Sequence, residues 1–233
     1  MKSIFISGAS RGIGLELCRQ NLKRGHFIIA ACRNPDEATQ LSSLRKTYEN
    51  LLILPLDVDN EESVHQCFEQ LQEKDIKIDV LFNNAGIIDW RGIRKVSPLA
   101  FSQVLRTNLV GAFLVLHYAL PCLEKSSDPW VYNMSSRLGS IKLRGNTQLG
   151  GAIAYQCSKS GLNMLTKQAS IDLASSGVKV VSISPGWVKT DMGGNNAKYE
   201  IQDSVSKIIA VTDRMSIEQN GRFLGEDGKE IPW

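Results

Sequence analysis

Two residues four positions apart could carry out acid–base chemistry. Tyr155 and Lys159 are separated by three residues, and this spacing places two side chains on the same face of a helix. A charged lysine beside a tyrosine phenol favours the phenolate, so it would lower the pKa of the tyrosine below its usual value of about 10. The pair is therefore a candidate acid–base couple near neutral pH. The same spacing also occurs on the solvent-exposed faces of ordinary helices.

Polar residues elsewhere in the chain could assist such a pair. Ser135 and Ser136 directly follow the apolar run Trp130–Met134, which predicts a strand with two hydroxyl groups at its end. Asn108 interrupts an otherwise apolar helical pattern over about Phe101–Leu123. An asparagine amide competes with the helix backbone for hydrogen bonds. Asn108 therefore indicates either a local kink with a bound water or a plain polar position.

A glycine-rich loop near the start of the chain could bind a dinucleotide. The predicted strand Ser3–Ser7 runs directly into Gly8-x3-Gly12-x-Gly14, and a helical pattern follows. Glycines permit a tight turn and close approach of the backbone to phosphates, and a helix N-terminus offers free N–H groups. The spacing differs from the general G-x-G-x-x-G fingerprint. The loop alone could also be an ordinary strand-to-helix turn.

The residues after the second predicted strand, Phe27–Ala31, bear on the choice of cofactor. An acidic residue near the end of this strand would bind the ribose 2′-hydroxyl of NAD. This chain has Cys32-Arg33 there and no acid before Asp36. An arginine can pair with a 2′-phosphate, and Arg11 could join it. The pattern favours NADP, unless both arginines are simply surface residues.

Three further strand ends carry residues suited to a ligand. Asp57 follows the predicted strand Leu51–Leu56 and could contact adenine or cap the next helix near Asn60. The segment Asn83-Asn84-Ala85-Gly86 follows the predicted strand Ile78–Phe82, and its small residues and amides permit close backbone approach. A proline–glycine loop starting at Ser184 follows the predicted strand Lys179–Ile183.

These strands alternate with helices at roughly regular spacing, which is typical of an α/β protein. Helices are expected over about 37–48, 61–73, 101–123 and 155–175, and a short edge strand over 221–224. The prediction is a single domain over 1–233 with a Rossmann-type, doubly wound parallel sheet of about seven strands and helices on both faces. The irregular stretch 137–154 and the segment from Asp191 to about Met215 should shape a roomy pocket with a mobile lid.

Composition narrows the possible partners and location. The net charge of +3 includes no dense run of Lys or Arg, so neither nucleic acid nor membrane binding is expected. The sequence contains no stretch of 18 apolar residues, so no transmembrane helix is expected. The first predicted strand begins too early to leave room for a signal peptide. Five scattered cysteines indicate reduced thiols, and three isolated histidines give little support for a metal site. We therefore expect a cytoplasmic protein.

Taken together, these motifs resemble the short-chain dehydrogenase/reductase family over nearly the whole chain. They are, in order, Gly8-x3-Gly12-x-Gly14, Asn83-Asn84-Ala85-Gly86, Asn108, Ser136, Tyr155-x3-Lys159 and Pro185-Gly186. Within the family, the chain looks most like the C-factor and sniffer-type carbonyl reductases. The long spacing from Ser136 to Tyr155 and the tail ending in Ile231-Pro232-Trp233 carry that closer resemblance.

The resemblance implies a role for each matching residue. Tyr155 would be the proton donor or acceptor, and Lys159 would lower its pKa and hold the nicotinamide ribose. Ser136 would polarise the substrate carbonyl, with Ser135 as the less favoured candidate, and Asn108 would bind a water that continues a proton relay to solvent. The residues that would bind NADP(H) are Gly8, Ser10, Arg11, Gly12, Ile13, Gly14, Arg33, Asp57, Val58, Asn84, Ala85, Gly86, Tyr155, Lys159, Pro185, Gly186, Val188 and Thr190.

The implied activity is NADPH-dependent reduction of aldehyde or ketone carbonyls on a small-molecule substrate. Two alternatives remain at this point: an NAD-dependent alcohol or steroid dehydrogenase, and a nucleotide-binding signalling protein of the C-factor type. The family also implies a homodimer or homotetramer, often formed through the helices that hold Asn108 and Tyr155.

Overall fold

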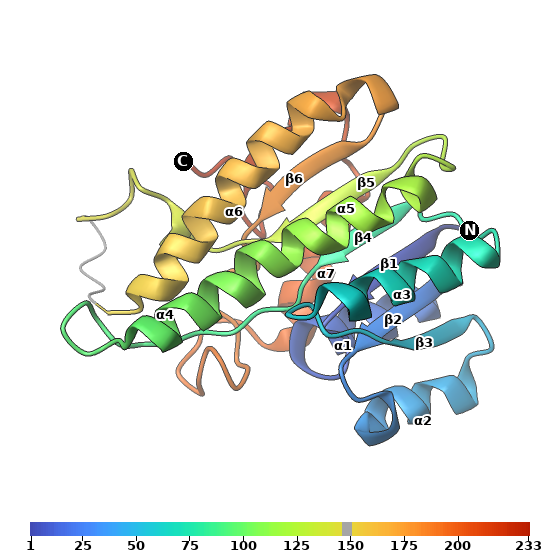
Figure 1. Ribbon diagram of the computed structural model, residues 1–233, viewed down its shortest axis with the longest axis horizontal. Helices are drawn as coiled ribbons and strands as arrows, with labels where there is room; N and C mark the ends of the chain where they lie inside the picture. The colour runs from blue at the N-terminus through green and yellow to red at the C-terminus, as the bar shows by residue number, and fades with distance from the viewer. Residues whose placement is uncertain (146–150) are drawn as a thin grey trace.

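A seven-stranded, fully parallel sheet forms the centre of the molecule in a computed structural model that describes residues 1–145 and 151–233 (Figure 1). The strand order is β3-β2-β1-β4-β5-β6-β7. The strands are β1 (Ser3–Ser7), β2 (Phe27–Cys32), β3 (Leu51–Pro55), β4 (Val80–Asn83), β5 (Trp130–Met134), β6 (Lys179–Ile183) and β7 (Phe223–Leu224). The predicted fold class is confirmed.

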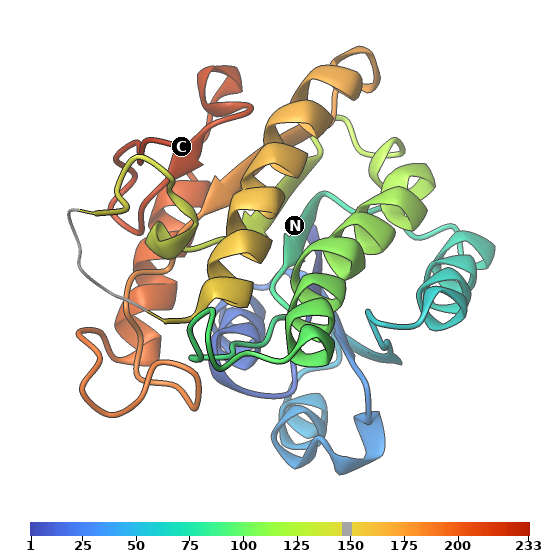
Figure 2. The ribbon, with the colours of Figure 1, turned by 60° about the vertical axis from the view of Figure 1, so that its left-hand side comes forward.

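Helices cover both faces of this sheet because successive strand residues point to opposite sides. In β1, Ile4 and Ile6 pack with α1 and α7, whereas Phe5 packs with α3 and α5. Figures 1 and 2 show α3, α5 and α6 on one face and α1 and α7 on the other. The α-helices are α1 (Gly12–Lys23), α2 (Thr39–Thr47), α3 (Glu61–Glu73), α4 (Pro98–Leu105), α5 (Gly111–Leu123), α6 (Ile153–Asp172) and α7 (Ile201–Thr212).

The predicted helix over Phe101–Leu123 is three elements rather than one. It begins earlier than expected, because Pro98 opens α4 and the Ser97 hydroxyl accepts a hydrogen bond from the N–H of Ala100. A π-helical turn, η2 (Arg106–Val110), then separates α4 from α5. Asn108 lies inside this turn, so it marks a local irregularity of the helix rather than a plain polar position, while the bound water predicted for it stays a prediction.

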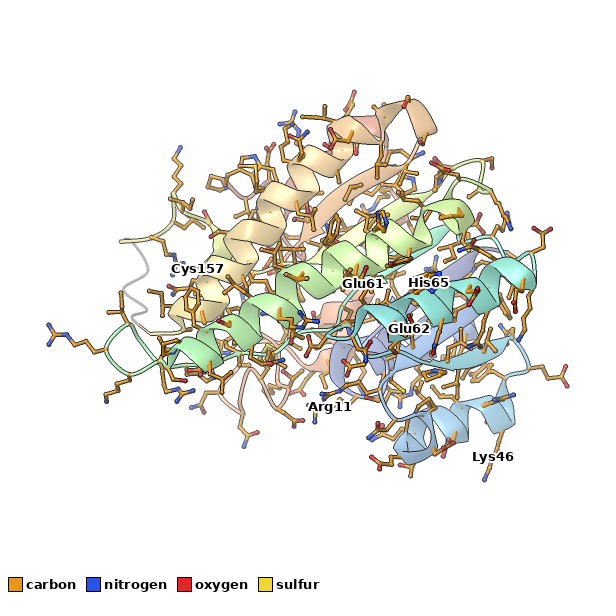
Figure 3. The ribbon with its side chains drawn as sticks, in the orientation of Figure 1. Arg11, Lys46, Glu61, Glu62, His65 and Cys157 are labelled. Atoms are coloured by element: carbon orange, nitrogen blue, oxygen red, sulfur yellow. The ribbon has the colours of Figure 1, made fainter. Side chains whose placement is uncertain are left out.

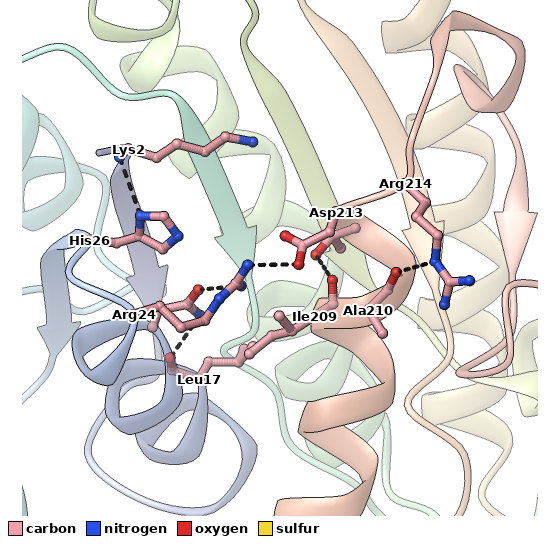
Figure 4. A network of polar contacts seen from close by, with 10 residues as sticks. Lys2, Leu17, Arg24, His26, Ile209, Ala210, Asp213 and Arg214 are labelled. Carbon is pink, nitrogen blue, oxygen red and sulfur yellow. Dashed lines mark hydrogen bonds and ion pairs between the residues drawn. The ribbon is translucent and has the colours of Figure 1, made fainter.

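Helix α7 was not expected from the sequence. It lies within the segment from Asp191 to Met215 that was predicted to form a mobile lid, but Val205 and Ile208 are fully buried in the core. At its C-terminal end, Asp213 accepts a hydrogen bond at 2.6 Å from Arg24, just after α1 (Figure 4). The lid prediction is therefore wrong for α7, and only residues 191–200 remain an irregular loop.

Part of the irregular stretch 137–154 lies outside the described residues, which omit 146–150.

The span Pro98–Leu123 is long and apolar enough, by length and composition alone, to cross a membrane, with a mean hydropathy of 1.5. Within the fold, Val115 and Ala119 of this span are fully buried against the sheet and α3. A core helix of a globular protein has the same composition.

Candidate active site

The candidate site lies where the strand order reverses, between β1 and β4. In doubly wound sheets ligands bind in the crevice beyond the carboxyl ends of the strands at this switch point. A cavity of about 1030 Å³ occupies that place. The predicted residues that line it are Gly8, Ser10, Arg11, Gly12, Ile13, Arg33, Asp57, Val58, Asn84, Ala85, Gly86, Tyr155, Lys159, Pro185 and Thr190.

The glycine loop forms one wall of the cavity and could accept a pyrophosphate. Gly8 has a φ of +65°, and a Cβ there would lie 2.8 Å from the Cα of Ala85. A Cβ on Gly14 would lie 2.3 Å from the main-chain oxygen of Gly8. Only glycine fits either position. The first turn of α1 contains no acidic residue and no side chain caps it, which leaves its N–H groups free for an anion.

The two arginines predicted to distinguish NADP from NAD both line the cavity. Arg33 is exposed on the cavity wall next to Cys32, and Asp36 is not among the lining residues. Arg11 projects from the start of α1 (Figure 3), and its guanidinium lies 3.4 Å from the carboxylate of Asp191. Both arginines are therefore placed where a phosphate could reach them.

Asp57 does not cap α3. The cap is Asn60, whose side chain accepts the N–H of Ser63. Asp57 instead accepts the N–H of Asp59 at 3.1 Å and lines the cavity. The predicted role of Asp57 as a helix cap is therefore wrong, and its predicted contact with the adenine stays a prediction.

At the opposite end of the cavity, three side chains meet. Helix α6 presents Tyr155 and Lys159, both buried, and the Lys159 ammonium lies 5.5 Å from the centre of the Tyr155 ring. Ser136, the second residue after β5, lies close enough to the Tyr155 phenol to lower its pKa. The other serine, Ser135, is buried and donates its hydroxyl to Asn163 at 2.7 Å. Ser135, and not Ser136, is among the residues that line the cavity, but its hydroxyl is engaged by Asn163. The role of Ser136 on the substrate carbonyl therefore stays a prediction, supported by its effect on Tyr155.

The pKa expectation for Tyr155 was wrong in direction. Burial raises the pKa of Tyr155 to about 12, and the hydrogen bond with Ser136 lowers it only in part. Lys159 does not offset this effect, because its ammonium donates to the main-chain oxygen of Met134 at 2.7 Å rather than to the phenol. Burial also lowers the pKa of Lys159 to about 8. At neutral pH the phenol holds its proton and the lysine is mostly charged.

The π turn fixes Asn108 between two parts of the site. Its amide donates to the main-chain oxygen of Ile87 and to the hydroxyl of Ser158, both at 2.9 Å, and accepts the N–H of Ile87 at 2.8 Å. The amide therefore ties the loop after β4 to α6. Because both of its N–H groups are used, a relay water at Asn108 would rely on its other oxygen lone pair or on the main chain, and the relay stays a prediction.

Other predicted residues lie behind the cavity wall. Gly14 supports the glycine loop, Gly186 packs beside the ring of Tyr199 and the carboxyl of Glu226, and Val188 is buried and paired with Tyr199. These positions suit a supporting role better than direct contact. Cys157, close to Tyr155 in sequence, is exposed on the outer side of α6 (Figure 3).

Several lining residues were not anticipated from sequence. They include Met134, Lys189, and Gln103 and Thr107 beside Asp59, whereas Asp191 and Met192 belong to the segment that was predicted to shape the pocket. The position of Met134 as the last residue of β5 was a usable signal, since strand ends meet at one edge of a parallel sheet. The others carry no local signal. Among the described residues, no group of three or more His, Cys, Asp or Glu side chains could hold a metal ion.

Comparison with known proteins agrees with this arrangement. Carbonyl reductase from chicken fatty liver, solved with NADPH bound, has 33% identity and a TM-score of 0.95, with 100% of this chain and 99% of that chain covered. Carbonyl reductase Sniffer of D. melanogaster has 36% identity and a TM-score of 0.93, with both chains fully covered. C-signal from Myxococcus xanthus is 39% identical over 157 residues, which cover 67% of this chain and 93% of that protein. The short chain dehydrogenase family model matches residues 2–200, so the chain belongs to the short-chain dehydrogenase/reductase family.

Proposed function

We propose that this protein is an NADPH-dependent reductase of aldehyde and ketone carbonyls. One observation carries the proposal: Tyr155 and Lys159 line the same cavity as the glycine loop, whose helix has no acidic residue in its first turn, and Ser136 acts on the phenol of Tyr155. A dinucleotide that binds with its phosphates at the glycine loop would extend toward Tyr155. The two solved carbonyl reductases of the same fold support the assignment.

The bound cofactor would supply the hydride, which adds to the carbonyl carbon. Negative charge then develops on the carbonyl oxygen. Ser136 donates a hydrogen bond to that oxygen, and the Tyr155 phenol donates the proton that completes the alcohol. A phenol whose pKa is about 12 is protonated at neutral pH, as a proton donor must be. The charged Lys159 ammonium, which lines the cavity beside Tyr155, would bind the ribose hydroxyls of the cofactor.

The test is turnover of NADPH with a panel of aldehydes, quinones and diketones, in the wild type and in Tyr155→Phe. Removing a general acid costs about 10²- to 10⁴-fold in rate, so Tyr155→Phe should lose at least about a hundredfold in kcat. Tyr118→Phe is the matched control, because Tyr118 is half-buried on α5, is not among the residues that line the cavity, and its hydroxyl donates to Glu61. Absence of turnover for every carbonyl, in the wild type and variant alike, would reject the proposal.

A signalling role is the second candidate, favoured by the 39% identity with C-signal. The two candidates differ in their need for Tyr155. In a host that lacks this protein and shows a defect, rescue by Tyr155→Phe would favour signalling without chemistry. Failure of Tyr155→Phe to rescue, where wild type succeeds, would favour the enzyme.

We further propose a soluble, cytoplasmic homodimer or homotetramer that binds no nucleic acid and no membrane. Figure 1 shows α4, α5 and α6 side by side on one face of the molecule. Large apolar side chains are exposed on these helices: Leu99, Val110 at the π turn, Phe113, Met164 and Ile171. A second copy of the chain would cover this face.

A further inference from the structure

The C-terminal tail, Gly221–Trp233, is fixed on the edge of the sheet. Its first part is β7, which pairs with β6. The chain then turns back, with Leu224 bridged to Glu230 in antiparallel fashion. The N–H of Ile231 donates to the main-chain oxygen of Phe223 at 2.7 Å, and the ring of Trp233 stacks on that of Phe223 with centres 5.7 Å apart. The end of the tail therefore has a defined position.

From that position the tail contacts the catalytic loop, defined here as Ser136–Arg144. The Ser140 hydroxyl, fully buried, donates to the main-chain oxygen of Pro232 at 2.5 Å. The N–H of Lys142 donates to the main-chain oxygen of Trp233 at 2.9 Å. A third contact lies next to Ser136 itself, where the Arg137 guanidinium is 3.8 Å from the carboxylate of Glu226.

Glu226 is a carboxylate with an unusual position. Its side chain is only 9% exposed, and its Oε2 atom has no hydrogen-bond partner among the described residues. A buried carboxylate is costly unless a cation lies near it. Arg137 is the cation within salt-bridge distance, so separating the two would leave a buried charge unpaired. This cost holds Arg137, and hence the first turn of the catalytic loop, against the tail.

The other side of the catalytic loop rests on the helix that carries the acid–base pair. A Cβ on Gly139 would lie 2.7 Å from the Cβ of Lys159, so the loop backbone packs directly on α6. The main-chain oxygen of Gly139 accepts the hydroxyl of Ser160 at 2.8 Å. Ser136 opens this turn and accepts the N–H of Leu138 at 3.1 Å. The turn is thus held between α6 and the tail.

We propose that the tail is a positioning element for Ser136. Pro232 holds Ser140, Trp233 holds Lys142, and Glu226 holds Arg137. This inference rests on the proposed carbonyl reduction, in which Ser136 must point at the same oxygen as Tyr155. A displacement of about 1 Å in a reacting group can cost on the order of 100-fold in rate. Loosening the tail should therefore lower kcat through Ser136 while the phosphate cradle, at the far end of the cavity, is unaffected.

The experiment compares Trp233→Ala and Ser140→Ala with wild type. We expect kcat for a small aldehyde to fall about tenfold, with the NADPH dissociation constant from calorimetry unchanged within about twofold. Ser43→Ala is the matched control, because the Ser43 hydroxyl also donates to a main-chain oxygen, that of Thr39 on α2, far from the loop. Ser140→Ala removes a single oxygen atom. If circular dichroism shows that Trp233→Ala does not fold, Ser140→Ala alone tests the positioning role of the tail.

A double-mutant cycle separates positioning of Ser136 from general stability. In a Ser136→Ala background, Ser140→Ala should cause no further loss of kcat, because the residue being positioned is already absent. Equal losses in both backgrounds, or parallel losses of kcat and NADPH affinity, would overturn the positioning role. An active wild type with insensitive tail variants would also overturn it. A wild type that reduces no carbonyl would reject the proposed function instead.

Discussion

At the scale of single residues, burial dominates the electrostatics of the candidate site. Tyr155 and Lys159 share one face of α6, as their spacing predicts, yet their pKa values move apart: the pKa of the tyrosine rises instead of falling, and the pKa of the lysine falls. Burial raises the pKa of Tyr155 to about 12 and lowers that of Lys159 to about 8. Each shift favours the neutral form of its group, which is the general effect of removing a charge from water. Sequence spacing shows which residues meet but not how deeply they are buried.

These pKa values predict the pH dependence of the reduction. Lys159 is charged below about pH 8 and loses its proton above it, whereas Tyr155 keeps its proton up to about pH 12. We expect kcat/KM for NADPH to be level from pH 6 to 7.5 and to fall above pH 8, by up to about tenfold per pH unit for loss of one essential proton. This ratio reports the groups of the ligand-free enzyme. A level profile up to pH 10 would exclude a required charge on Lys159.

Arg33 predicts the preference for the phosphorylated cofactor. A charge-assisted contact to a phosphate contributes about 1.5–3 kcal/mol, so Arg33→Ser should weaken NADPH binding by about 10- to 150-fold. NADH binding should change little, because it lacks the 2′-phosphate. Calorimetry with both cofactors measures the two affinities. Arg45→Ser, an exposed arginine on α2 outside the cavity, is the control. A wild type that prefers NADH would instead support the dehydrogenase alternative.

At the scale of helices and strands, local patterns predicted most of the fold. The bounds of α3, β5 and β6 match expectation, because each is a strongly periodic or apolar run flanked by turn residues. Helix α7 was missed, since its apolar residues follow a long polar loop and carry no strong start signal. The π turn was indicated only by Asn108. Its extra residue shifts the register between α4 and α5, and that shift depends on the tertiary contacts of Asn108 rather than on helix propensity.

The π turn should therefore depend on Asn108. Asn108→Ala removes three hydrogen bonds and leaves the part-buried N–H and main-chain oxygen of Ile87 without this partner, whereas the Ser158 hydroxyl still donates to the main-chain oxygen of Tyr155. An unsatisfied buried group costs about 1–3 kcal/mol, so the variant should lose roughly 3 kcal/mol of unfolding free energy in urea. Asn34→Ala, whose amide contacts only the exposed Glu37, should lose less than about 0.5 kcal/mol. A loss below 1 kcal/mol for Asn108→Ala would show that the turn forms without these bonds.

At the scale of the whole molecule, the helices that cover the two faces of the sheet differ in what they expose to solvent. On one face α7 packs against α1 and is joined to it by the Arg24–Asp213 ion pair (Figure 4). On the other face, α5 and α6 bury one side on the sheet and expose apolar residues on the opposite side. Scattered exposed apolar residues are ordinary, but several on adjacent helices are typical of a contact surface, which supports the proposed association. No single-helix pattern in the sequence reveals this face, because it is made by helices that are apart in the chain.

Association through this face gives the last prediction. Phe113 on α5 is 47% exposed and Met164 on α6 is 68% exposed. Replacing both with glutamate would place charges in an apolar contact, where each is costly to bury without a partner. The Phe113→Glu/Met164→Glu double variant should be monomeric by light scattering after size-exclusion chromatography, at concentrations where wild type is a dimer or tetramer. Ile217→Glu, equally exposed at 68% but near the tail, should leave the wild-type assembly intact. Dissociation by Ile217→Glu alone would place the interface at the other end of the sheet, and a monomeric wild type would remove the proposed assembly altogether.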